Sequence, residues 1–192
     1  MIKAAMRTTM TERAELLPVL AEVFRAHGYE GASLALMTAA TELGKGSLYH
    51  FFPGGKEQMA AEVLADIDRL FNETVYEPLR QTNDPMQGIA GMFAAVDRYF
   101  QSGRRVCLVG VVALGAARDA FGEQVKTYFA GWIDALAAAL RRSGIEKGVA
   151  RRQAEQVVLE IQGALVLARA LDDPKVFSRA LDQAKLRLNM KR

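Results

Sequence analysis

The sequence predicts an all-α protein of about nine helices, in which a small N-terminal unit precedes a larger helical body. Alanine and leucine are abundant, whereas only 5 of the 192 residues are prolines, a balance that favours helix. Apolar residues recur at spacings of three and four in one segment after another, which is the period of a helix with one buried face. We find no stretch with the apolar–polar alternation that predicts a strand.

Bulk composition narrows the class of protein. Hydrophobic residues make up 51% and charged residues 24% of the chain, as in ordinary globular proteins. The net charge of +3 is only a weak sign of an anionic partner, since residues 1–60 contain six basic and six acidic side chains. The single cysteine, Cys107, fits a reducing cytoplasm. We expect a cytoplasmic protein, because we see no signal peptide and the longest apolar run, residues 106–117, is too short to cross a bilayer.

The first helix is predicted over residues 11–27 and ends at Gly28. Pro18 lies inside it and removes one backbone hydrogen bond, so the helix either kinks there or begins near Leu17. The inward stripe of this helix consists of Leu16, Leu17, Leu20, Val23 and Phe24.

Two short helices joined by a tight turn come next. Ser33 is a suitable N-cap for the first of them, because its hydroxyl accepts a hydrogen bond from a free N–H of the first turn. Glu42, Leu43 and Gly44 make the turn, and Gly44 is able to take a positive φ at low cost. The second helix is predicted over residues 45–52, with Leu48 and Phe52 pointing inward at a spacing of four.

This pair of helices is a helix-turn-helix motif, and its residues suit a DNA groove. The second helix opens with small residues, Gly44, Gly46 and Ser47, so its N-terminus can approach base edges closely. Lys45 either donates to guanine or contacts a phosphate. An ordinary αα-hairpin has a similar pattern, so the motif alone leaves the alternative open.

The body is predicted to contain six further helices. Asp84-Pro85 and Asp173-Pro174 each have an N-cap residue followed by proline, which marks a helix start. The predicted helices are residues 56–76, 84–100, 105–117, 119–142, 149–171 and 173–190. The fifth of these is apolar nearly all round, which predicts burial on more than one face.

The motif residues resemble a known family. The run G-K-G-S-L-Y-H-F-F-P at residues 44–53 resembles the DNA-reading segment of TetR-family repressors, and residues 24–33 resemble the family's first-to-second helix junction. The doubled glycine after Pro53 is similar to the LmrA/YxaF-like subgroup. The body resembles the same subgroup at residues 107–114 and 132–144.

The resemblance implies a domain division and a set of DNA contacts. Residues 1–55 would form the DNA-binding domain and residues 56–192 a ligand-binding and dimerisation domain. Tyr49 matches the tyrosine that contacts the DNA backbone, whereas His50 either faces DNA or is a solvated surface residue. For Ser33, capping and phosphate binding are both open, and one residue can do both. The full DNA-binding set is Thr11, Ser33, Lys45, Gly46, Ser47, Tyr49, His50 and Lys56. The chain departs from the family pattern at Thr38 and at Glu42, where the family commonly has alanine and glycine.

The resemblance also implies a ligand pocket in the body. Its expected members are Met92, Phe93, Val96, Phe100, Cys107, Leu108, Val111, Phe129, Trp132, Ile133, Gln162 and Arg169. The alternative is that the aromatic and aliphatic members are simply core. Glu160, Gln162 and Arg169 lie in a nearly all-apolar helix and need partners, so they pair with each other, cross a dimer interface or hold polar atoms of a ligand.

The expected function is that of a ligand-responsive transcriptional repressor, a homodimer that binds a palindromic double-stranded operator and is released by a small apolar or aromatic inducer. Two alternatives remain: a DNA-binding protein controlled by a protein partner instead of a ligand, and an enzyme or carrier on the same scaffold. We expect no catalytic site, metal or cofactor, because no catalytic motif stands out and His27, His50 and Cys107 have no metal-ligand spacing.

Overall fold

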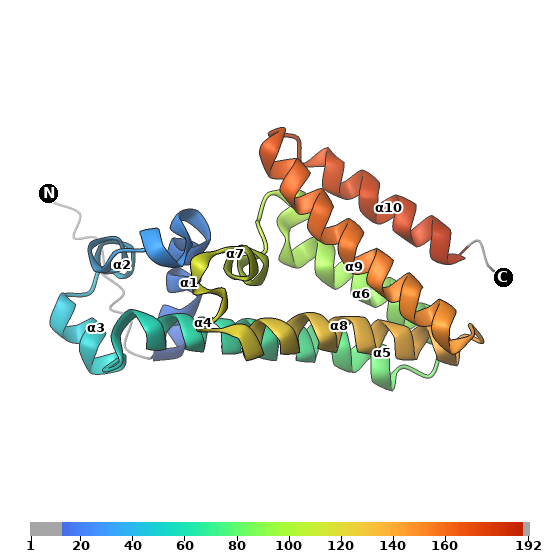
Figure 1. Cartoon of the computed structure of the whole chain (residues 1–192), viewed down its shortest axis with the longest axis horizontal. Helices are drawn as coiled ribbons and strands as arrows, with labels where there is room; N and C mark the ends of the chain where they lie inside the picture. Colours follow the sequence, from blue (N-terminus) through green and yellow to red (C-terminus); the bar gives the residue numbers. More distant parts are fainter. Residues whose placement is uncertain (1–12, 190–192) are drawn as a thin grey trace, which may run out of the picture.

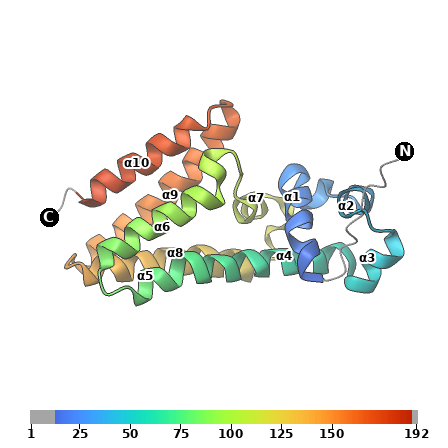
Figure 2. The same cartoon turned by 180° about the vertical axis from the view of Figure 1, so that it is seen from behind.

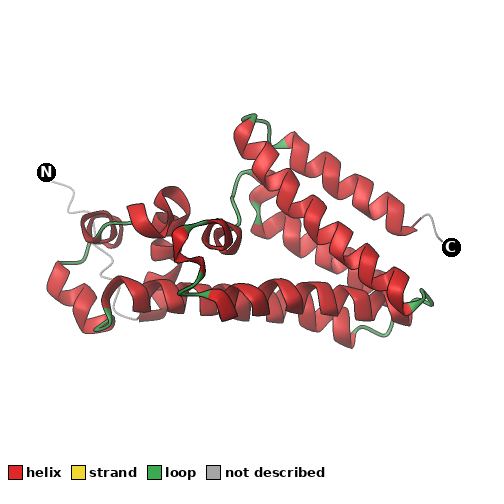
Figure 3. Cartoon of the chain, in the orientation of Figure 1, coloured by secondary structure: helices red, strands yellow, loops and turns green. Residues whose placement is uncertain are grey.

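The computed structural model describes residues 13–189, and all regular structure in that range is helical (Figure 3). The predicted all-α fold is therefore confirmed. The α-helices in chain order are α1 (Arg13–Gly31), α2 (Leu34–Thr41), α3 (Lys45–Phe51), α4 (Gly55–Phe71), α5 (Glu77–Gln81), α6 (Pro85–Tyr99), α7 (Leu108–Leu114), α8 (Gly122–Arg142), α9 (Lys147–Ala170) and α10 (Lys175–Asn189). A π-helical turn, Asn72–Tyr76, joins α4 to α5 without a break, so the described count agrees with the predicted nine.

The molecule is elongated, with α1, α2 and α3 at one end and α9 and α10 towards the other (Figure 1). We call α1 to α3 the head and the remaining helices the body. The continuous helix formed by α4, the π turn and α5 runs from the head along the body beside α8 (Figures 1 and 2). Helix α7 lies between α1 and α8 and contacts both (Figure 1). It therefore contributes, together with α4, to the contact between the body and the head.

The helix starts follow the predicted caps. The Ser33 Oγ accepts a hydrogen bond from the Leu36 N–H at 3.3 Å, and an Asp84 carboxylate oxygen accepts from the N–H groups of Met86 and Gln87. A Glu146 carboxylate, which the sequence did not single out, caps α9 by accepting from two N–H groups of its first turn, and these bonds lower the pKa of Glu146. Each cap satisfies backbone donors that a helix leaves free.

Several predicted boundaries are corrected. Helix α1 begins no later than Arg13 rather than near Leu17, and its only non-helical residue is Gly28, with φ 67°. The predicted helix 105–117 is shorter: α7 covers only Leu108–Leu114, and a separate 3₁₀ turn, Ala116–Arg118, follows Gly115. Pro78 does not end its helix, because the π turn before it widens the backbone where proline lacks an N–H.

The core of the body is aromatic. Phe71 lies at its centre, with its ring 4.7 to 6.2 Å, centroid to centroid, from the rings of Tyr76, Tyr99, Phe100, Tyr128 and Trp132. The Tyr76 hydroxyl donates to the Tyr128 carbonyl at 2.8 Å. Because Phe71 comes from α4 and its partners come from the π turn, α6 and α8, this cluster holds the long helix against the body.

Candidate functional site

The turn between α2 and α3 has its strained residue at an unexpected position. Glu42 ends α2 in the left-handed conformation, with φ 56° and ψ 17°, whereas Gly44 has φ −68° and is the N-cap of α3. Gly44 could take a positive φ at low cost, but the residue that takes it is Glu42. A left-handed residue with a Cβ costs about 1 kcal/mol. This explains physically why a glycine would suit position 42.

Helix α3 exposes the predicted reading residues. Leu48 and, directly after the helix, Phe52 are fully buried and anchor it. The face away from these anchors is exposed and carries Lys45, Gly46, Ser47, Tyr49 and His50. Figure 1 shows α3 at the extreme end of the molecule, clear of the body. No described atom lies within 4 Å of the position that a Cβ would take on Gly46, so this side of the helix is open to a partner.

Three further predicted DNA contacts differ in their situation. Ser33 is exposed but its hydroxyl caps α2, as described above. The Lys56 Nζ donates to the carbonyls of Tyr29 and Glu30, at 3.0 and 3.4 Å, and lies 4.6 Å from the centroid of the Tyr29 ring. Lys56 thus ties α4 to the C-terminal end of α1. Thr11 lies outside the described residues.

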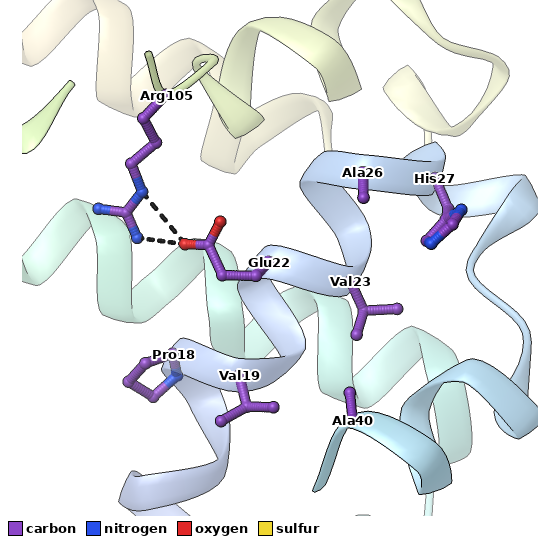
Figure 4. Close-up of a pocket in the computed structure, with 8 residues that line it drawn as sticks. All are labelled: Pro18, Val19, Glu22, Val23, Ala26, His27, Ala40 and Arg105. Atoms are coloured by element: carbon purple, nitrogen blue, oxygen red, sulfur yellow. Dashed lines mark hydrogen bonds and ion pairs between the residues drawn. The ribbon is translucent and has the colours of Figure 1, made fainter. Parts of the chain in front are cut away.

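A polar cluster joins the head to the body. The buried Arg25 of α1 donates to the Tyr99 hydroxyl at 2.8 Å and to Glu22 at 2.6 Å. Arg105, in the loop before α7, donates to the same Glu22 oxygen at 2.5 and 3.1 Å (Figure 4). Its guanidinium lies 4.8 Å from the centroid of the Tyr99 ring. Burial raises the pKa of Tyr99 in spite of the two arginines, so its hydroxyl stays protonated at neutral pH.

This cluster borders an open groove of about 540 Å³ on the surface of the head (Figure 4). The groove is lined by Pro18, Val19, Glu22, Val23, Ala26, His27, Ala40 and Arg105. Ala40 of α2 is exposed at this groove. Arg105 is the only residue of the lining that comes from the body, so the groove follows the seam between the two parts.

A second hollow, of about 660 Å³, lies between α7, α8 and α9. We call it the cavity. Five predicted ligand contacts line it, namely Cys107, Val111, Phe129, Gln162 and Arg169. The other lining residues, which the prediction did not include, are Val106, Gly110, Ala113, Leu114, Leu159, Gly163, Leu165, Val166 and Ala170. The lining residues on α9 belong to the predicted helix 149–171, whose apolar residues lie nearly all round it. That pattern was the sequence signal from which these lining residues could have been predicted.

The remaining predicted ligand contacts lie elsewhere. Met92, Phe93, Val96, Phe100, Leu108 and Trp132 are each at most 2% exposed and belong to the packed core. Ile133 is partly buried against that core. The Trp132 indole N–H points at the Met92 sulfur, 3.5 Å away. These seven residues do not line the cavity, so the structure does not bring the predicted set together.

The polar residues of α9 separate into two groups. Glu160 pairs with Arg187 of α10 through two hydrogen bonds of 2.6 and 2.7 Å, and accepts another from Gln156. Partial burial raises the pKa of Glu160, but the hydrogen bonds from Arg187 and Gln156 together lower it by more, so the net result is a lowered pKa. Gln162 and Arg169 instead line the cavity. Glu160 is therefore paired, but with Arg187 and Gln156 and not with Gln162 or Arg169 as predicted.

Apolar side chains remain exposed on the outer side of the body. Leu159, Val166, Leu167 and Leu171, on and just after α9, are 52 to 66% exposed, and Leu186 of α10 is 54% exposed. Leu114, at the end of α7, is 87% exposed. Apolar residues gathered on neighbouring helices indicate an interaction surface.

Comparison with known proteins agrees with this arrangement. A family model described as "Transcriptional regulator LmrA/YxaF-like, C-terminal domain" matches residues 85–183, just over half of the chain. A second one, "Bacterial regulatory proteins, tetR family", matches residues 16–63. None of the helices within residues 13–189 combines the length and the apolar character that a membrane crossing requires.

Individual relatives belong to the same class. The HTH-type transcriptional regulator LmrA of Bacillus subtilis (strain 168) is 24% identical over 160 residues, which are 81% of this chain and 85% of LmrA. The HTH-type transcriptional repressor DhaR of Mycobacterium sp. (strain GP1) is 26% identical over 163 residues, 80% of each chain. Among solved structures, a cysteine mutant of the TetR-family regulator CifR in complex with a 26-bp double-strand operator superposes with a TM-score of 0.72 at 26% identity, covering 91% of this chain and 95% of CifR. This chain belongs to the TetR family of transcriptional regulators, with its helix-turn-helix DNA-binding domain in the head and an LmrA/YxaF-like C-terminal domain in the body.

Proposed function

We propose that this protein is a repressor that binds a palindromic operator as a homodimer and leaves it when a small apolar or aromatic inducer enters the cavity. The observation that carries the proposal is the position of Arg105. Arg105 contacts α1 through its ion pair with Glu22. The next two residues in the chain, Val106 and Cys107, line the cavity. A ligand that displaces the wall of the cavity would therefore act directly on one of the contacts between the body and the head.

DNA would be read by the exposed face of α3. Lys45, Gly46 and Ser47 stand at its N-terminus, where base contacts concentrate in helix-turn-helix proteins. Tyr49 and His50 would contact the backbone beside them, and Ser33 would do so from the N-terminus of α2. Thr11 and Lys56 complete the proposed set. For Lys56 the role is chiefly to position α4, because its ammonium group already donates to two carbonyls.

Dimerisation is proposed through α9 and α10. The exposed Leu167, Leu171 and Leu186, which do not line the cavity, would be covered by the same residues of a second copy. A two-fold interface of this kind places two heads on two half-sites of a palindrome. DhaR is named a repressor and CifR was crystallised with operator DNA, and both support the same reading of this chain. A cytoplasmic location is part of the same proposal.

The cavity also argues against the alternative of a DNA-binding protein without a small ligand. A body that served only to dimerise has no need of a concave apolar site, whereas this one has a hollow of about 660 Å³ that opens at the surface beside Leu114, Leu159 and Val166. That volume lies within the range of known small-molecule sites, roughly 300 to 1,000 Å³. The lining is apolar with a few polar groups, as in such sites.

The test is selection of genomic DNA fragments by the purified full-length protein, followed by gel-shift titration. We expect enrichment of fragments that share an inverted repeat, bound by two copies of the chain. Ser47→Glu places a carboxylate on the groove-facing side of α3 and should abolish this binding. Ser143→Glu adds the same charge at the C-terminus of α8, at the far end of the molecule, and should not. Enrichment without a repeat, or undiminished binding by Ser47→Glu, would contradict the proposal.

A further inference from the structure

We propose that the cavity selects apolar ligands that carry a neutral hydrogen-bond acceptor, and that Gln162 is the residue that recognises the acceptor. The inference rests on the proposed function, because it assigns the chemistry of the inducer to the cavity. It adds a ligand class and a specificity-determining side chain.

The first step concerns which polar groups face the cavity. Its lining has fourteen residues, and only Cys107, Gln162 and Arg169 carry polar side-chain atoms. Arg169 is exposed, so its guanidinium is solvated at the rim. Cys107 is 6% exposed and lies at the inner end, at the N-terminus of α7. A ligand that fills the cavity therefore meets one strong hydrogen-bonding group inside it, the amide of Gln162.

The second step is that this amide has an unused donor. The Gln162 Nε2 is buried and has no hydrogen-bond partner among the described residues. Its Oε1 lies 3.1 Å from the point that a Cβ on Gly110 would occupy. The absence of a side chain at Gly110 thus leaves room for the amide beside α7. A buried amide N–H without a partner is destabilising, and a ligand oxygen that accepts from it would remove this cost.

The third step decides the charge of the acceptor. Burial raises the pKa of Cys107, and the neighbouring polar groups of Gly110, Tyr128 and Gln162 only partly offset this effect. The thiol, which lines the cavity, is therefore neutral at pH 7, because burial at this end of the cavity disfavours negative charge. A ketone, ether or hydroxyl oxygen fits this environment, whereas a carboxylate does not.

The test compares two probes of nearly equal shape, benzophenone and diphenylmethane, which differ by a carbonyl in place of a methylene. Each is titrated calorimetrically into the full-length protein without DNA. We expect benzophenone to bind about tenfold more tightly, the ratio expected for one neutral hydrogen bond. In Gln162→Leu the ratio should fall to about one, while diphenylmethane binds at least as tightly as before. Gln162→Met, with an unbranched side chain of similar length, should give the same loss and guards against a misfolded leucine variant.

The matched control is Gln153→Leu. Gln153 lies on the same helix, is 9% exposed and also has a buried polar atom without a partner, but it does not line the cavity. The Gln153→Leu variant should retain the tenfold preference for benzophenone over diphenylmethane. Equal affinity for the two probes, a preference that survives both Gln162 variants, or no binding of either probe would overturn the inference. Because no operator enters the measurement, failure here is separate from failure of DNA selection, which tests the proposed function.

Discussion

The proposed dimer makes a quantitative prediction for Leu167, which lies on α9 and is 52% exposed in the single chain. Complete burial of a leucine side chain stabilises by about 1.5 to 3 kcal/mol, so covering the exposed half contributes about 1 kcal/mol. A two-fold interface contains the residue twice, which doubles the loss. Leu167→Glu also places two carboxylates in an apolar contact, and each costs several kcal/mol unless it is paired.

The sum exceeds about 4 kcal/mol, so the dissociation constant of the dimer should rise by about a thousandfold or more. Sedimentation velocity over a series of micromolar concentrations would measure this change. Ala90→Glu, at an exposed position of α6, serves as the control and should remain dimeric. Leu165 is not a suitable position, because it is 3% exposed and a charge there would disrupt the core. A Leu167→Glu protein that is dimeric at micromolar concentration would refute the placement of the interface on α9.

Four further predictions concern single side chains. Tyr49→Ala should weaken binding to operator and random DNA by a similar factor, about tenfold, because a phosphate contact carries no sequence information; a changed operator preference in gel-shift competition would contradict this role. The free energy of unfolding, measured in urea, should be about 1 kcal/mol higher for Glu42→Gly than for Glu42→Ala, since only glycine adopts the positive φ without steric strain. Equal free energies for the two variants would contradict the strain argument. Arg105→Gln should lower Tm by about 2 °C in thermal denaturation, whereas Arg118→Gln, in an exposed pair, should not. Cys107 should react with a disulfide reagent at pH 7.5 far more slowly in the native protein than in urea, because its raised pKa leaves little thiolate; similar rates would show that the thiol is accessible and activated.

Local signals in the sequence were sufficient for most helices. The caps at Ser33 and Asp84 and the spacing of Leu48 and Phe52 each involve residues within one turn, and the structure confirms all three. The left-handed residue of the turn was missed because glycine permits a positive φ without requiring it. Which residue takes that conformation depends on where α2 ends, and α2 ends at Thr41.

The cavity could be predicted only in part, since periodicity shows that a helix face is apolar but not what lies opposite. The aromatic stripe that includes Phe93, Phe100 and Trp132 had the same pattern as a ligand pocket, yet these side chains fill the core. The partner of Glu160 is Arg187, which is 27 residues away and on another helix. Neither the packing of the aromatic side chains nor the pairing of Glu160 with Arg187 can be predicted from the residues that neighbour them in the sequence.

The energetics of the head–body seam suit the proposed release from DNA. The Glu22 side chain is 56% exposed and that of Arg105 is 22% exposed, so solvent screens their ion pair and it contributes at most about 1 kcal/mol. Coupling between a ligand and DNA typically amounts to about 1 to 3 kcal/mol. An inducer therefore needs only a modest preference for the state in which residues 105–107 have moved. A deeply buried pair at this position would have demanded a much larger difference in ligand affinity between the two states.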